Sequence, residues 1–203
     1  MKLTIAIVLA CAGIAHAEPV PVAVGVNLPF GWAGGHSLAG SVSVGLTEHQ
    51  AIRANVASYE DRALVSDVVA IAMGGDGDEA TRSGRTTDLG LGWTLYPDGL
   101  WQGFTVELGG LYRHRNLKVE DDFASPASRA TRTETFGGRA LVGWSWLLYG
   151  RVTISAAVGV SVGHESGTET TNEDLHGMPM TTDVSRVDVE AEAFVRIGVA
   201  FGG

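Results

Sequence analysis

His164 and Ser166 come nearest, in residue type and spacing, to a catalytic pair in this sequence. Two positions apart on an extended strand, their side chains project to the same side. A histidine that takes the proton of a serine hydroxyl could drive acyl transfer, but the histidine also needs an acid to orient it. Glu165 projects to the opposite side, and the sequence assigns no third partner. We therefore expect no catalytic residues and no enzyme.

Two segments contain residues that can ligate metal ions. His176, Met178 and Met180 offer soft ligands suited to copper(I). The acidic, glycine-rich segment 74–80 lacks the ligand spacing of a calcium loop, so a solvated turn is the better interpretation. Three soft ligands in one loop are more often a coincidence than a site. We expect no metal and no cofactor, and the sequence also lacks GxSxG, P-loop and HExxH motifs.

The first residues predict export from the cytoplasm. Lys2 precedes an apolar run that ends near Gly13, and residues 15–17 form a small-x-small cleavage site, so 1–17 is predicted to be a cleaved signal peptide. A lipoprotein signal with a lipidated Cys11 is the alternative, but the preceding "VLA" is a poor lipobox. Cys11 is the only cysteine, so residues 18–203, the predicted mature domain, form no disulfide.

The charge balance excludes one class of partner. The chain has a formal net charge of −9, and removing the signal peptide takes away one lysine and no acid. Apart from Lys2, the only lysine is Lys118, and no run of basic residues occurs. An acidic exported chain of this kind is a poor nucleic-acid binder. No apolar stretch of the mature chain reaches the ~20 residues of a spanning helix, so the chain would enter a membrane as strands.

Apolar residues recur at every second position along most of the mature chain, which is the period of a strand with one apolar face. Eight segments show this alternation, close to the roughly 10 residues that a tilted membrane strand requires. They run over 20–30, 37–46, 52–57, 88–95, 104–113, 136–148, 152–163 and 187–201. We therefore predict an all-β fold, an eight-stranded antiparallel up-and-down transmembrane β-barrel.

The connections alternate in length in the way that outer-membrane barrels require. Short turns are predicted at 47–50, 97–101 and 149–151, and long polar loops at about 60–85, 118–131 and 165–183. Short turns of such barrels face the periplasm, which places both termini there. Residues 62–73 are apolar for an external loop and would form either a short helix or an extension of the preceding strand.

Aromatic residues on the apolar face gather toward the two rims, as they do at lipid interfaces. This predicted girdle comprises Phe30, Tyr112 and Phe136 near the loops, and Trp93, Phe104, Trp144, Trp146 and Phe201 near the turns. A soluble periplasmic lipocalin-like barrel is the alternative fold. Its water-facing side would be the Gly, Ala, Ser and Thr face, which lacks the dispersed Lys and Glu of a wet surface.

Charged residues on the other face would then point into the barrel. Isolated charges near mid-membrane would cost many kcal/mol, so they should pair and be hydrogen-bonded. We predict a structural Arg–Glu network comprising Arg53, Glu107, Arg113, Arg139, Glu190, Glu192 and Arg196, with Asp88 and Arg186 nearer the loops.

The interior of an eight-stranded barrel is narrow enough for side chains to fill. The small inward residues of 37–46 and 152–163 should face the larger Arg53, Tyr59, Arg139 and Tyr149. The lumen is therefore expected to be plugged and wet, and a narrow proton or ion path is the alternative.

The signal peptide, eight strands, unequal rims, girdles and final strand closing on Phe201 resemble the small outer-membrane barrels, of the outer membrane protein A transmembrane domain and outer membrane protein X type. The resemblance covers the mature chain and lies in pattern. Gly202 and Gly203 depart from it, because the family usually ends on the aromatic residue that the insertion machinery reads.

This resemblance implies a monomer in the Gram-negative outer membrane, with outer-membrane lipids, lipopolysaccharide and the insertion machinery as partners. The implied function is non-enzymatic, supporting the envelope and presenting loops at the surface. Lipid A deacylase barrels keep a His–Ser pair on the lipid-facing wall, so His164 and Ser166 suggest a lipid A-modifying hydrolase as the alternative.

Overall fold

The computed structural model of the chain describes residues 20–29, 38–60, 81–120, 128–172 and 179–202. These residues form the strands β1 (Val22–Pro29), β2 (Leu38–Thr47), β3 (Gln50–Glu60), β4 (Thr81–Leu95), β5 (Gly103–Glu120), β6 (Ser128–Leu148), β7 (Val152–Asn172) and β8 (Met180–Phe201). In these ranges, no helix is long and apolar enough to cross a membrane. The predicted signal peptide, Phe30, residues 62–80, His176 and Met178 lie outside the described residues.

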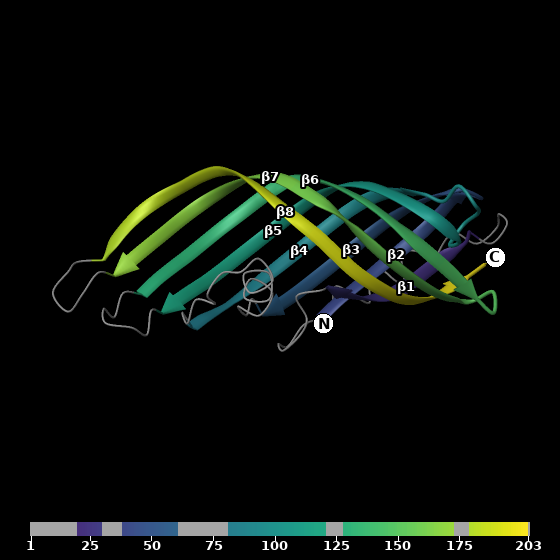
Figure 1. Cartoon of the computed structure of the whole chain (residues 1–203), viewed down its shortest axis with the longest axis horizontal. Coiled ribbons are helices and arrows are strands. Elements are labelled where there is room, and N and C mark those ends of the chain that lie inside the picture. Colours follow the sequence, from purple (N-terminus) through teal and green to yellow (C-terminus); the bar gives the residue numbers. More distant parts are fainter. Residues whose placement is uncertain (1–19, 30–37, 61–80, 121–127, 173–178, 203) are drawn as a thin grey trace, which may run out of the picture.

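The eight strands form one closed barrel in chain order (Figure 1). Every neighbouring pair is antiparallel, and β8 closes the ring on β1 from Val22↔Phe201 to Pro29↔Phe194. The prediction of an all-β, eight-stranded up-and-down barrel is confirmed. Closure leaves no edge strand over the paired region, so these backbone groups are satisfied within the sheet.

The register of the strands fixes their stagger. Starting from Val26 and moving from β1 to β8, successive partners are Gly40, Val56, Leu89, Tyr112, Phe136, His164 and Val187. Across the closing pair, however, Val26 lies opposite Ile197, ten residues further along β8. A stagger of this size in a barrel of eight strands accompanies strands tilted by about 35–45° to the axis.

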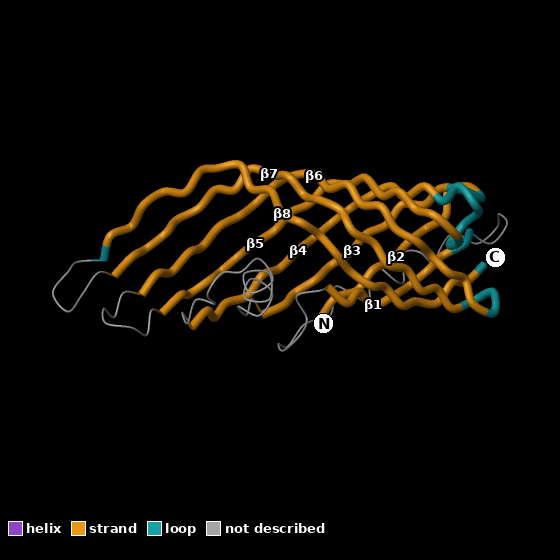
Figure 2. The backbone as a smooth tube through the Cα atoms, viewed as in Figure 1, coloured by secondary structure: helices purple, strands orange, loops and turns teal. Residues whose placement is uncertain are grey.

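The two rims of the barrel differ. The turns at 48–49, 96–102 and 149–151 form one end, the turn rim, where β1 begins and β8 ends (Figure 2). At the opposite end, the loop rim, β1, β3, β5 and β7 end and β2, β4, β6 and β8 begin. The three short turns therefore lie where the sequence predicted them.

The long loops predicted at 60–85, 118–131 and 165–183 are partly wrong, because strands occupy much of these segments. β6, β7 and β8 are 21, 21 and 22 residues long and extend past the end of β1 (Figure 1). Toward the loop rim both faces become polar, so the apolar alternation fades although pairing continues. Threonine-rich stretches such as 168–171 retain high β-propensity without an apolar face.

Apolar side chains cover the outside of the barrel, and most of the buried side chains inside it are polar or charged. Large outward residues are exposed in the middle of the wall, including Leu91 at 61%, Val158 at 57% and Leu108 at 51%. Conversely, the buried residues include Arg53, Glu107 and many serines and threonines. This is the reverse of a water-soluble protein, in which exposed apolar residues rarely form a continuous surface.

The turn between β6 and β7 contains a strained residue, Tyr149, whose position differs from the prediction. Tyr149 was expected to face the lumen, but it is 98% exposed because it forms the turn itself. Its φ of 53° lies in the left-handed region, and Gly150 follows with a φ of 67°. Two successive positive φ values favour Asn-Gly at such hairpin turns.

Replacing Tyr149 by asparagine should therefore stabilise the folded barrel by up to about 1 kcal/mol, because asparagine tolerates positive φ better. Urea unfolding of the detergent-folded protein, followed by tryptophan fluorescence, measures this change. Tyr149→Val is the control and should destabilise, since a β-branched residue is poorly tolerated at positive φ. Equal midpoints for the two variants would contradict the assigned backbone conformation.

Candidate functional site in the barrel interior

The outer wall places most of the predicted girdle near the two rims. Trp93, Phe104, Trp146 and Phe201 lie within two residues of a strand end at the turn rim, and Trp144 lies two residues further up β6. On the loop side, the rings of Tyr112 and Phe136 are in contact, with their centroids 4.8 Å apart. The middle of the wall between these aromatics is aliphatic.

One carboxylate lies at the centre of a group of arginines inside the barrel, which we call the turn-side cluster: Glu107, Arg53, Arg139 and Arg196. Nη1 of Arg53 and Nη2 of Arg139 donate to the two Glu107 oxygens at 2.7 and 2.6 Å, and Nη1 of Arg196 donates at 3.0 Å. Glu107 is 3% exposed and the arginines are 6–7% exposed. The group comes from β3, β5, β6 and β8, so it crosses the interior.

Further bonds hold these arginines in place. Arg53 donates through Nε to Ser43 Oγ at 2.7 Å and through Nη2 to the Tyr96 hydroxyl at 2.6 Å. Arg139 also donates to Oδ1 of Asn55 at 2.5 Å. Gly90 makes room for this amide, since a Cβ there would lie 2.6 Å from Asn55 Oδ1. The guanidinium groups of Arg53 and Arg139 are therefore fixed by neutral partners as well as by Glu107.

On the turn-rim side of this cluster, the 96–102 turn folds inward and fills the turn end of the lumen. Tyr96 is 1% exposed and Trp101 is 5% exposed, with their rings in an edge contact at 5.4 Å. They pack with Ala23, Ala51 and Ala200. Ser145 Oγ donates to the Trp101 carbonyl at 2.9 Å, which anchors the turn to β6.

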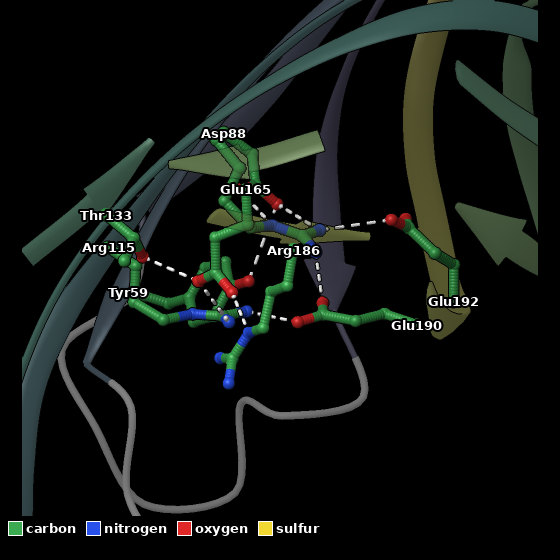
Figure 3. A network of polar contacts seen from close by, with 9 residues as sticks. Tyr59, Asp88, Arg115, Thr133, Glu165, Arg186, Glu190 and Glu192 are labelled. Carbon is green, nitrogen blue, oxygen red and sulfur yellow. Dashed lines mark hydrogen bonds and ion pairs between the residues drawn. The ribbon is translucent and has the colours of Figure 1, made fainter. Parts of the chain in front are cut away.

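A second network, the loop-side cluster, lies nearer the loop rim (Figure 3). Its members are Asp88, Arg113, Arg115, Glu165, Arg186, Glu190 and Glu192. Arg113 donates to Asp88 at 2.8 and 3.0 Å, to Glu192 at 3.0 Å, and to Glu190. Arg115 also donates to Glu190, so Glu190 joins the two arginines.

Glu165 forms the outermost part of this cluster, beyond the level of Phe136. Thr133 Oγ1 donates to it at 2.7 Å and Arg186 Nε at 2.6 Å (Figure 3). Burial raises the pKa of this carboxyl, but the hydrogen bonds from Thr133 and Arg186 and the charges of Arg186 and Arg115 outweigh burial. The resulting pKa is lowered.

Glu165→Gln should remove part of the acid sensitivity of the barrel. Because the folded-state pKa lies below the ordinary value of 4.5, the stability from Glu165 is complete above 4.5 and is lost as the pH falls through the lower folded value. Unfolding midpoints of the variant measured between pH 7 and pH 3 should thus fall less steeply than those of the parent. A steeper fall for the variant would contradict this arrangement.

The structure divides the seven charges predicted for the lumen between the two clusters. Arg53, Glu107, Arg139 and Arg196 meet in one, whereas Arg113, Glu190 and Glu192 meet in the other with Asp88 and Arg186. Sequence reasoning missed Tyr96 and Trp101 at the turn end, and Arg115 and Glu165 at the loop end. Continuing the inward period from Thr94 to Tyr96 and from Arg113 to Arg115 would have found two of these residues.

His164 and Ser166 lie on the outer wall of β7, on the loop side of the girdle. Glu134 of β6 is the cross-strand partner of Ser166. Its Oε1 atom lies 3.8 Å from Nδ1 of His114 on β5. An acid therefore stands beside Ser166, which the sequence could not assign. No hydrogen bond within the described residues joins the Ser166 hydroxyl to either histidine.

The described part of the chain holds no group of three or more His, Cys, Asp or Glu residues that could bind a metal ion. Met180, the described member of the proposed soft-ligand set, begins β8 and is 70% exposed.

No family model matches the sequence, and the search of curated proteins finds no match. Among solved structures, the chain is similar to the crystal structure of a major outer membrane protein from Thermus thermophilus, with 16% sequence identity and a TM-score of 0.49. The similarity covers 92% of this chain and 99% of that chain. Likeness at this level carries no functional argument, so we infer the function from the barrel's own residues.

Proposed function

We propose that this protein is a monomeric, non-enzymatic barrel of the Gram-negative outer membrane, of the small eight-stranded type. One observation carries the proposal: exposed aliphatic side chains surround a barrel whose interior is charged and buried. In water, an exposed aliphatic wall and a buried charged interior would both be unfavourable. In a membrane, acyl chains would cover the aliphatic wall, and the charged interior would stay out of contact with lipid. A soluble lipocalin-like barrel would need the opposite orientation of each strand.

The interior favours a barrel with a closed lumen and not an open channel. Tyr96 and Trp101 fill the turn end, and guanidinium and carboxylate groups cross the lumen above them. The membrane-embedded protein is thereby expected to show no steady unitary conductance in planar lipid bilayers. Reproducible channel steps from the parent protein would support the narrow-path alternative and refute the closed barrel.

The proposed role is mechanical support of the envelope and display of the loops, with lipopolysaccharide as the surrounding lipid. Three basic residues support lipopolysaccharide as the surrounding lipid. Arg85, Lys118 and Arg132 lie on the outward face of neighbouring strands, on the loop side of the girdle. Basic side chains at that level suit phosphate groups. The role predicts that a deletion strain becomes more permeable to detergents and large antibiotics, and an unchanged strain would contradict it.

A second candidate function is hydrolysis of lipid A acyl chains, and Glu134 is the observation that favours it. Ser166, Glu134 and His114 form one row across β7, β6 and β5 on the outer wall, with His164 two residues from Ser166. A serine, histidines and a carboxylate are the components of a hydrolase. Their present spacing gives the serine no base, which is why the non-enzymatic role stands first.

Mass spectrometry of lipid A separates the two candidates. Cells that produce the parent protein and cells that produce His164→Ala or Ser166→Ala should contain identical lipid A if the barrel is non-enzymatic. Loss of an acyl chain that depends on both residues would instead establish the hydrolase.

A further inference from the structure

A small cavity lies inside the barrel between the turn-side cluster and the turn plug. Its volume is about 20 Å³, and both Arg53 and Arg196 line it. The hydroxyl-bearing residues Ser41, Ser43, Ser145, Thr153 and Ser155 also line it, together with Tyr96, Trp101 and parts of β1 and β8. No carboxylate lines it. The wall of the cavity therefore contains several side-chain groups that can donate hydrogen bonds to an anion.

The charges around this cavity do not balance within the described residues. The turn-side cluster sets three guanidinium groups against the single carboxylate of Glu107. An arginine cannot relieve the imbalance by losing its proton, because a guanidinium group stays protonated in proteins. The loop-side cluster has the opposite imbalance, with more carboxylates than arginines, but it is a separate network.

Arg196 also retains hydrogen-bonding capacity. Its Nη1 and Nη2 atoms point to Glu107, at 3.0 and 3.4 Å, while its buried Nε has no hydrogen-bond partner among the described residues. An unsatisfied buried donor on a charged group is costly. A net positive charge, an arginine with a free donor and several hydroxyl groups thus meet at one small space.

We propose that this cavity binds one small monovalent anion of halide size. Its volume exceeds the roughly 10–15 Å³ that one water molecule needs but is too small for a phosphate or a carboxylic acid. The anion would be held by Arg53, Arg196 and the hydroxyls of Thr153 and Ser155, and it would offset part of the positive charge that Glu107 leaves unbalanced. The site needs only a buried interior, so it is independent of the proposed envelope role.

Salt-dependent unfolding of the full chain in detergent micelles tests the proposal. Sodium bromide should raise the urea midpoint in a saturable manner, whereas sodium gluconate at equal ionic strength should not, because gluconate exceeds the cavity. Ser155→Ala should weaken the apparent bromide affinity several-fold. The matched control is Ser161→Ala, an inward serine of the same strand that does not line the cavity, and it should leave the affinity unchanged.

Anomalous diffraction from bromide-soaked crystals gives a second measurement that does not depend on variant folding. A bromide peak between Arg196 and Ser155 would support the site. Equal midpoints in bromide and gluconate at every concentration, or a cavity that contains only water in the soaked crystal, would overturn it.

Discussion

Glu107→Gln is expected to lower the free energy of unfolding by about 3–5 kcal/mol, the usual cost of removing one partner from a buried ion pair. The substitution keeps the shape of the side chain and removes its charge. Three arginines that are 6–7% exposed would then face one another without a carboxylate. Urea unfolding of the detergent-folded protein, monitored by heat-modifiable gel mobility and fluorescence, measures the loss.

The control for this change is Glu169→Gln at the loop rim. Glu169 also pairs with an arginine, Arg129, at 3.2 Å, but these side chains are 30% and 58% exposed. Exposed pairs contribute about 1 kcal/mol or less. Arg139→Gln should in turn cost less than Glu107→Gln, because it reduces the excess positive charge. A Glu107→Gln effect no larger than that of Glu169→Gln would contradict the central place of this carboxylate.

Val158→Arg is expected to destabilise the membrane-embedded barrel by about 2–4 kcal/mol, as charged residues do on the lipid face at mid-membrane. Val158 lies on the outward face of β7 and is 57% exposed, with Val142 and Ala193 as its cross-strand partners. Nothing in the described part of the protein crowds this position. The expected cost therefore comes from the surrounding lipid, and unfolding from lipid vesicles measures it.

Two substitutions show whether depth and face decide this effect. Val187→Arg places the same side chain on the outward face of β8, beyond the loop-side aromatics, and should cost about 1 kcal/mol or less. Ser155→Asn is a polar change on the inward face of β7 and should also cost less than Val158→Arg. If Ser155→Asn were the most damaging of the three, the assignment of inside and outside would be wrong.

Much of the fold could be predicted from the sequence because a strand alternates strictly. In β6, for example, Phe136, Val142 and Trp144 share one face, while Arg139 lies on the other. Such a pattern fixes the face of every residue once one face is assigned, and eight repeats of it fix the number of strands. The three short turns followed from the breaks between these runs.

The rest depended on information that alternation does not carry. The loop-side halves of β6, β7 and β8 are polar on both faces, so their pairing with neighbours, not their pattern, makes them strands. The stagger between strands decides which charged residues meet. It brings Glu192 to Arg113 in the loop-side cluster and leaves it outside the turn-side cluster around Glu107. The inward position of Trp101 depends on a seven-residue turn whose path the period of the strands cannot predict.

Membrane partition of the folded protein tests the central claim, that lipid contacts the aliphatic wall. Cells producing the chain should be fractionated, washed with alkaline carbonate, and the protein followed by its heat-dependent shift in gel mobility. We predict that the folded form stays with the outer-membrane fraction and leaves it only in detergent. A folded monomer recovered from the periplasmic fraction, dispersed in buffer without detergent, would contradict the account.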